Sequence, residues 1–409
     1  MQKKLIALAV AGLASTAAFA QTNVTIYGIV DYGYAYRFDA RGFDAVSNQL
    51  NNAGKPSSSS QLNSGQQSGN RLGFKGTEDL GNGLKAVFLL EQGFALDTGR
   101  QGGAQSVPAN ADASNQPMFN RQAYAGLSGG FGTMVGGRLY TPYYTFVSGL
   151  DPFGAGTVGS YRNAFSSAMQ VSNGTAFQSL TDPLRVDNAL AYISPSFGGF
   201  QVTGAFSNNA NADDSSGNNS RNNTVYAVLG KYESGALTLG ANYHYIAAGT
   251  TLNPTLLVPG VNNVQNFTLG GSFDFKVAKV MALYSWSNTD IDNAGVPLTN
   301  IAGDATLNNY MIGATVPFGK FAGKLSYIYS DGNTAALGDA QQLAAGLDYN
   351  LSKRTNLYSA YSWIDNSQSR MAGVGDATVN GGSYTAASSG APWGGVFQQG
   401  FQVGLRHMF

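Results

Sequence analysis

The sequence predicts an all-β protein, built as one closed barrel of sixteen antiparallel strands that crosses a membrane. Three observations lead to this fold. Side chains alternate with a period of two along most of the chain, short and long connections alternate between these segments, and no segment after residue 20 holds about 20 consecutive apolar residues, as a transmembrane helix would. Glycine and aromatic residues are abundant, with 54 Gly, 22 Tyr and 23 Phe in 409 residues. Helix-forming residues are diluted, so no window predicts an amphipathic helix.

The period of two is clearest in "VQNFTLGGSFDFK", residues 264–276. Phe267, Leu269 and Phe273 fall on one face of this segment, and Thr268 and Ser272 fall on the other. Because successive side chains of a strand point to opposite faces, the pattern predicts a strand with one apolar and one polar face. A single such segment also fits a soluble β-sandwich, so the prediction of a membrane barrel depends on how the segments repeat.

Seven short and eight long connections join the sixteen predicted strands. An even strand number with short turns on one side and long loops on the other is typical of bacterial outer-membrane barrels. The short turns lie near Gly81–Gly83, Ser128–Gly132, Ser194–Gly199, Glu233–Gly235, Val277–Lys279, Gly319–Gly323 and Ser352–Arg354. The long loops cover about 39–68, 97–117, 139–184, 207–221, 248–263, 289–304, 331–338 and 366–394.

The absence of water in the lipid hydrocarbon explains why such a chain forms a closed barrel. Every backbone N–H and C=O group within the hydrocarbon must be paired inside the protein, and a closed sheet achieves this without an edge. Sixteen strands enclose more space than wall side chains can fill, so an aqueous lumen is expected. Aromatic residues near the strand ends, such as Tyr32–Tyr36, Tyr243, Tyr245, Tyr327 and Tyr329, are expected to form girdles at the membrane interfaces.

The N-terminal segment "MQKKLIALAVAGLASTAAFA" predicts a signal peptide over residues 1–20, followed by a single barrel domain over 21–409. Lys3 and Lys4 precede a short apolar run, and Ala18-Phe19-Ala20 matches a cleavage site. Its removal lowers the net charge from 0 to −2, because it takes away two lysines and no acid. That charge offers no basic platform for nucleic acid, and the chain has no cysteine for disulfides.

Four segments resemble the general diffusion porins of Gram-negative outer membranes, most closely the betaproteobacterial type. They are "GNRLGFKGTEDLGNGLKAVFLLEQGF" (69–94), "FNRQAYAGLSGGFGTMVGGRLYTPYY" (119–144), "DNALAYISPSFGGF" (187–200) and the terminal "GLRHMF". The resemblance implies a homotrimer in the outer membrane, in contact with its lipid, with the third long loop folded into each barrel. It implies passive diffusion of small hydrophilic solutes and inorganic ions, without a cofactor or a metal.

The end of the chain, "FQVGLRHMF", alternates in the same way as the other predicted strands. Phe401, Val403, Leu405, His407 and Phe409 fall on one face. The porin resemblance implies that this pattern is the signal read by the outer-membrane assembly machinery. It also implies that the last strand pairs with the first.

The third long loop contains "SGLDPFGAG", residues 148–156. On its own, the Asp-Pro pair fits an ordinary turn in an external loop. The porin resemblance implies instead that Asp151, Pro152, Phe153 and Gly154 belong to a constriction loop, which bends inward and narrows the barrel to an eyelet.

The resemblance also implies a basic cluster on the barrel wall opposite that loop. Arg71 and Arg121 match its positions and fall on the lumen side of their predicted strands, and Arg138 and Arg185 are expected as further members. Guanidinium groups facing Asp151 would create a transverse field across the passage. An excess of arginine there suggests a mild preference for anions.

Three alternatives stay open on the sequence. A substrate-selective porin should carry an aromatic track along its lumen, whereas the aromatic residues here fall largely on the apolar face. A barrel-embedded enzyme or a non-conducting adhesin would belong to other functional classes. Enzymatic activity is not expected, because the chain has two His, no Cys and no nucleophile motif. "DIDNAG" (290–295) begins like a calcium loop, but Ile301 stands where an acid is required.

Overall fold

The computed structural model describes residues 23–44, 49–51, 58–101, 117–165, 182–208, 210, 224–250, 260–292, 304–333, 338–366, 374 and 396–409. The expected signal peptide, residues 1–20, lies outside the described residues and stays a prediction. No helix in the described part of the chain is both long enough and apolar enough to span a bilayer.

Within the described residues, sixteen strands form the wall of one closed antiparallel barrel, which confirms the predicted fold class. Each strand pairs with its neighbours in chain order. The strands are β1 (Asn23–Asp44), β4 (Arg71–Gly81), β5 (Leu84–Gly93), β6 (Gln122–Gly129), β7 (Gly132–Tyr140), β8 (Arg185–Ile193), β9 (Phe200–Ser207), β10 (Thr224–Ser234), β11 (Leu237–Thr250), β12 (Gly260–Asp274), β13 (Lys279–Asp292), β14 (Ala305–Phe318), β15 (Phe321–Gly332), β16 (Ala340–Asn350), β17 (Thr355–Asn366) and β18 (Val396–Met408).

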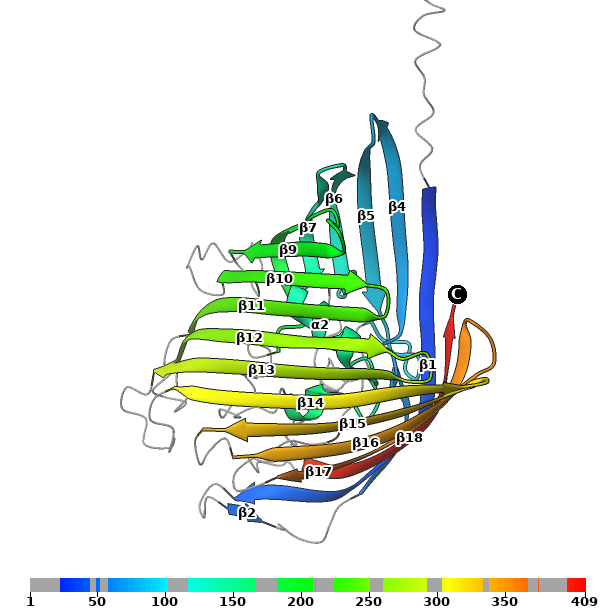
Figure 1. Ribbon diagram of the computed structural model, residues 1–409. Coiled ribbons are helices and arrows are strands. Elements are labelled where there is room, and N and C mark those ends of the chain that lie inside the picture. The colour runs from blue at the N-terminus through cyan, green and yellow to red at the C-terminus, as the bar shows by residue number, and fades with distance from the viewer. Residues whose placement is uncertain are drawn as a thin grey trace, which may run out of the picture.

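The first strand closes the barrel because it pairs on both of its sides (Figure 1). One side runs antiparallel to β4, from Asn23 opposite Thr77 to Ile29 opposite Arg71. The other side runs antiparallel to β18 along most of its length. Closure leaves no strand edge in the hydrocarbon, where an unpaired backbone group would cost several kcal/mol.

The last residue takes part in this closure. The amide of Phe409 donates to the carbonyl of Gly28, and the amide of Gly28 donates to the carbonyl of Phe409, both at 3.1 Å. The predicted alternation of β18 is also present, since its odd-numbered side chains share the outer face. Phe401, Val403, Leu405 and Phe409 are exposed there, and the ring of His407 meets the hydroxyl of Thr355 at 2.8 Å.

Among the described residues, seven short connections join the strands at one end of the barrel, as the sequence predicts. The tight β4–β5 turn shows why glycine is needed there, because Gly81, Asn82 and Gly83 all have positive φ angles, of 87°, 52° and 78°. The first long loop, predicted over 39–68, is different in the structure. β1 continues to Asp44, and the short strands β2 (Gln49–Asn51) and β3 (Ser59–Ser64) pair with it.

The partner strand of β1 is interrupted by six residues, Gly65–Asn70, which we call insert 65–70. Ser64 of β3 lies opposite Tyr32, and Arg71 of β4 lies opposite Ile29. Only Val30 and Asp31 therefore separate the two paired stretches on β1. The unequal count makes the insert an enlarged β-bulge.

Burial along β10 shows the two faces of the wall. Tyr226 and Val228 are exposed on the outside, whereas Val225 and Ala227 beside them are buried. The apolar outer face suits lipid, and the inner face is covered in part by chain inside the barrel.

The longest loop begins with a helix, although the sequence predicted none. Helix α2 (Pro142–Leu150) starts at Thr141, whose hydroxyl accepts a hydrogen bond from the amide of Tyr144 at 3.0 Å. A second short helix, α3, covers Arg162–Phe165. Propensity did not predict α2 because its stability comes from packing, with Phe146 and Val147 among its buried side chains.

We expect Gly28→Val to hinder closure of the barrel. A Cβ atom at this position would lie 2.4 Å from the ring of Phe409 and 2.6 Å from the carbonyl oxygen of Arg71. Overpacking of this kind costs about 1–3 kcal/mol. The measurement is the heat-dependent mobility shift of the folded barrel in SDS gels. In the control Gly230→Val, the nearest atom is 3.6 Å away, in Phe200. Equal folded fractions for both variants would contradict the prediction.

Candidate functional site

The described part of the third long loop, residues 141–165, lies inside the barrel and packs on its inner wall. Helix α2 contacts β9 to β13, and α3 contacts β15 and β16. Figure 1 shows α2 enclosed by the curve of the strands. The described stretch 141–165 is almost entirely buried, and Val147, Val158 and Tyr161 have no exposed surface. Burying each large apolar side chain stabilises the loop by roughly 1.5–3 kcal/mol.

Five wall glycines make room for this loop. At each of them, an added Cβ atom would lie only 2.5–2.8 Å from a side chain of the loop. The pairs are Gly240 with Phe146, Gly270 with Leu150, Gly313 with Pro152, Gly346 with Phe153 and Gly400 with Val158. Because the glycines lie on β11, β12, β14, β16 and β18, they form a track along the wall, which we call the glycine track. The track lets the loop pack directly against the backbone of the wall.

Polar side chains of the wall fix the tip of the loop. The amide of Val158 donates to the side-chain oxygen of Gln402 at 2.8 Å. The side-chain amide of Gln342 donates to the carbonyls of Gly159 and Ser160, at 3.0 and 3.1 Å. These bonds satisfy loop backbone groups that are shielded from water.

Asp151 stabilises the turn of the loop. Its carboxylate accepts the amides of Phe153, Ala155 and Tyr161 at 3.0, 2.9 and 3.1 Å, and the residue is 5% exposed. Burial raises the pKa of Asp151 to about 6, although the three amides favour the charged form. Asp151, Pro152 and Phe153 lie inside the barrel, as expected, because Pro152 and Phe153 pack against wall glycines. Gly154 turns the chain with a φ of 61°. The charge of Asp151, however, is enclosed by the loop and does not face the arginines.

A buried ion pair lies beside this turn. Arg162 pairs through Nε with Asp182, and the hydroxyl of Tyr161 donates to the same carboxylate at 2.9 Å. Burial raises the pKa of Asp182, and the neighbouring guanidinium opposes this effect. The pair ties the two described ends of the loop together.

Arg71, Arg121 and Arg185 gather around Tyr140, whose ring lies 5.0 Å from that of Tyr144 at the start of the inward loop. Nη2 of Arg121 and Nη2 of Arg185 donate to the Tyr140 hydroxyl at 2.6 and 3.1 Å. The guanidinium of Arg185 also lies over the Tyr140 ring, 4.8 Å from its centre. Arg71 is close enough to Arg121 for their charges to repel each other. The structure thus brings together three of the four arginines that the sequence singled out.

Arg138 lies outside this group. Its guanidinium pairs with Asp187, and its Nε donates to the carbonyl of Asn120 at 2.9 Å. It also lies opposite Ala123 in the β6–β7 ladder. A register shift between Gly137 and Leu139 disturbs β7 at this point, which the alternation of the sequence could not reveal.

Glu91 is the acid at the centre of the arginine group, and the sequence analysis missed it. Its carboxylate lies 2.7 Å from Nε of Arg121 and 3.9 Å from Nη1 of Arg71, and it accepts the Tyr27 hydroxyl at 2.8 Å. Its only signal is that it stands as a single acid in the apolar run "AVFLLEQGF". The group thus holds three guanidiniums and one carboxylate, which leaves an excess of positive charge.

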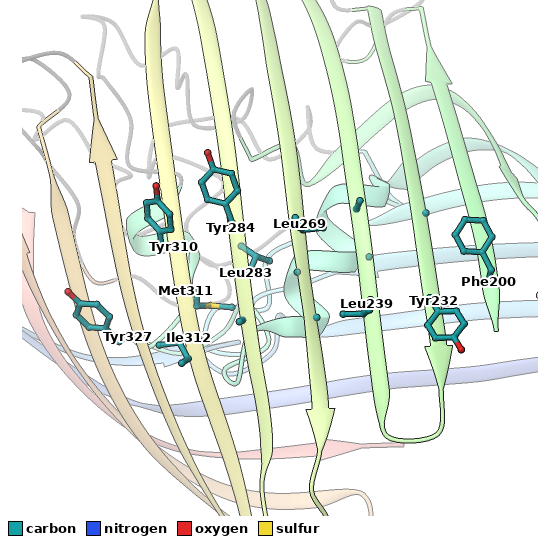
Figure 2. A pocket seen from close by; sticks show the side chains of 16 residues that line it. Phe200, Tyr232, Leu239, Leu269, Leu283, Tyr284, Tyr310, Met311, Ile312 and Tyr327 are labelled. Carbon is teal, nitrogen blue, oxygen red and sulfur yellow. The ribbon is translucent and has the colours of Figure 1, made fainter. Parts of the chain in front are cut away.

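A groove of about 850 Å³ lies on the outer wall (Figure 2). Leu239, Leu269 and Tyr310 line it and are 46–52% exposed. By contrast, Leu283 and Met311 at its floor are buried against the inward loop. The groove faces the membrane and is separate from the lumen and its arginines.

A closed barrel with an apolar outer face and a polar, arginine-bearing interior defines a channel of the bacterial outer membrane. The sequence matches the model of the Gram-negative porin family over residues 7–369. The chain belongs to this family, and its location is the outer membrane.

Known porins align with nearly the whole chain. It is 32% identical to outer membrane porin protein 32 of Delftia acidovorans, with all of both chains covered. It is 30% identical to an outer membrane porin protein of Bordetella pertussis, with 92% of this chain and 99% of the relative covered. Among solved structures, the anion-selective porin from Comamonas acidovorans superimposes with a TM-score of 0.68 at 28% identity, covering 95% of this chain and 100% of that one.

We expect Glu91→Gln to increase anion preference and to lower stability. The change leaves the surrounding guanidiniums without their carboxylate, and removing one partner of a buried pair costs about 3 kcal/mol. Thermal unfolding and the reversal potential in a KCl gradient measure the two effects. Glu233→Gln removes the same charge from an exposed pair with Lys231, which should cost less than about 1 kcal/mol. Similar behaviour of both variants would argue against a special role for Glu91.

Asp151 should make the stability depend on pH. The pKa of Asp151 rises from 3.8 to about 6 on folding, so its contribution is fully present below about 3.8 and is lost as the pH rises through about 6. The unfolding temperature should therefore fall more between about pH 4 and about pH 7 in the wild type than in Asp151→Asn. Parallel curves for the two proteins would disprove this contribution.

Proposed function

We propose that this protein is a passive channel for small hydrophilic solutes and inorganic ions, narrowed by the inward loop and mildly selective for anions. Solutes move down their own gradients, without a cofactor, a coupled ion or a chemical reaction. The passage runs between the loop, held on the glycine track, and the wall that carries Arg71, Arg121 and Arg185. The Comamonas acidovorans protein is an anion-selective porin, which agrees with this direction of selectivity.

The balance of charges across the lumen carries the proposal. The arginine group contains three cations and one acid, Glu91. On the loop side, the carboxylate of Asp151 accepts backbone amides and is buried. The transverse field expected from an exposed Asp151 is therefore weak, and the positive wall dominates the potential in the passage. Because the Debye length is about 8 Å at physiological salt, the resulting preference is mild.

We further propose that residues 1–20 are removed on export and that the mature barrels form a homotrimer in outer-membrane lipid. The family resemblance supports the trimer. The best candidates for its contacts are the outward faces of the early strands and the second long loop, 97–117, most of which lies outside the described residues. Those strands are short, with eight residues in β6 and β9 against fifteen in β12. The alternating face of β18, including Phe409, is proposed as the signal for the assembly machinery.

We expect Arg71→Ala and Arg121→Ala to reduce anion preference. In water, one unit charge at 4 Å contributes about 1 kcal/mol, which corresponds to about a fivefold change, and screening reduces this to about twofold. The measurement is the reversal potential of single channels in a planar bilayer under a KCl gradient. Arg138→Ala is the matched control, because it removes the same charge from outside the group. Unchanged selectivity in the first two variants would refute the assignment of the arginines, and absence of conductance from folded wild-type protein would refute the channel.

A further inference from the structure

We propose that insert 65–70 positions both sides of the passage, and that Asp31 and Tyr358 hold the insert in place. This inference rests on the proposed function, because it explains how the selective passage keeps its width and its charge. It assigns a positioning role to one residue of β1 and one residue of β17. Neither residue is among the positions that the porin resemblance implies for the basic cluster, the constriction loop or the C-terminal signal.

Asp31 fixes the insert from the wall. The side chain is fully buried, and Oδ2 accepts the amides of Gln67 and Ser68 at 2.8 and 2.6 Å. Oδ1 accepts the hydroxyl of Tyr358, from β17, at 2.7 Å. The backbone of Asp31 adds two bonds, since its amide donates to the side chain of Asn70 and its carbonyl accepts the amide of Gly65. One residue therefore holds the insert at its start, its middle and its end.

The insert contacts the arginine group directly. Nε of Arg71 donates to the carbonyl of Gly69 at 3.0 Å. A Cβ atom at Gly69 would lie 2.8 Å from Nη1 of Arg121, so this guanidinium rests against the insert. Displacement of the insert would remove an acceptor from Arg71 and open space beside Arg121.

The insert also contacts the tip of the inward loop. The amide of Thr157 donates to the carbonyl of Gln66 at 2.7 Å. A Cβ atom at Gly156 would lie only 2.0 Å from the carbonyl oxygen of Gln67, so the two backbones are in close contact. Because the same six residues contact the loop and the arginines, the insert sets the distance between the two sides.

A third set of bonds joins the insert to β16, β17 and β18, the strands that adjoin β1 on its other side. The side chain of Gln67 donates to Asp348 at 3.2 Å and accepts from Asn356 at 2.9 Å. Ser68 accepts a bond from Nη1 of Arg406 at 3.0 Å. The insert is thus held in the lumen by strands β1, β16, β17 and β18, and is a fixed part of the passage.

The experiment compares two variants of this support. Tyr358→Phe removes one donor without changing the charge. Asp31→Asn replaces one acceptor oxygen by an amide. It therefore loses either the bond from Tyr358 or the bonds from the amides of Gln67 and Ser68. Both should loosen the insert, raise the single-channel conductance, admit larger sugars in liposome swelling and lower anion preference by about twofold. For Asp31→Asn, the sign of the change in anion preference decides the question. Loss of a negative charge alone would raise anion preference, whereas displacement of the insert should lower it.

Tyr284→Phe is the matched control, since it removes a hydroxyl bonded to Asn308 at 2.8 Å on the outer wall. Heat-dependent gel mobility shows whether each variant is folded. If Asp31→Asn does not fold, Tyr358→Phe still decides the question. The proposal is overturned if Tyr358→Phe behaves like Tyr284→Phe, or if folded Asp31→Asn becomes more anion-selective. A wild-type channel without anion preference would contradict the proposed function instead. The single-channel conductance and the largest sugar admitted would still test whether the insert positions the passage.

Discussion

The need to pair every backbone polar group within the hydrocarbon determines the rest of this structure. The sheet must close, so β1 pairs on both sides and the last residue bonds to Gly28. Closure leaves each strand with one face toward lipid and one toward the lumen. The outer face is therefore apolar, and the inner face carries polar residues together with the apolar residues that pack against the inward loop. All freedom to shape the interior is left to the long loops and to interruptions of the strands.

A barrel of sixteen strands is too wide for wall side chains to fill, so this chain fills part of it with its own backbone. The glycine track provides the space on the wall that this inward loop occupies. Where the wall carries glycine, as at Gly240 and Gly346, the rings of Phe146 and Phe153 lie directly on the sheet. The abundance of glycine in the sequence thus has a role beyond turns. Side chains at these positions would push the loop away from the wall and into the passage.

The sequence allowed the strand number and the sides of the connections to be predicted, because these depend on local alternation and turn residues. The three clustered arginines were predicted from the porin resemblance. Asp151, Arg138 and insert 65–70 could not be predicted in the same way. The partners of Asp151 are amides of its own loop, and their positions depend on how the loop folds. Arg138 lies at a register shift, and Asp31, which holds the insert, is bonded to Tyr358, 327 residues away. Such long-range contacts leave no periodic trace in the sequence.

The buried acids account for the positive passage that we propose. Asp31 and Asp151 are held by backbone amides, Asp182 is paired with Arg162, and Glu91 is shared between two guanidiniums. Each of these carboxylates is surrounded by donors that offset its charge. The partners of Arg71 and Arg185 include neutral oxygens, the Gly69 carbonyl and the Tyr140 hydroxyl, which orient a guanidinium without neutralising it. A chain with equal numbers of acidic and basic residues can therefore carry a locally positive group, because Glu91 is 3% exposed whereas Arg71 and Arg121 keep 19% and 13% of their side-chain surface.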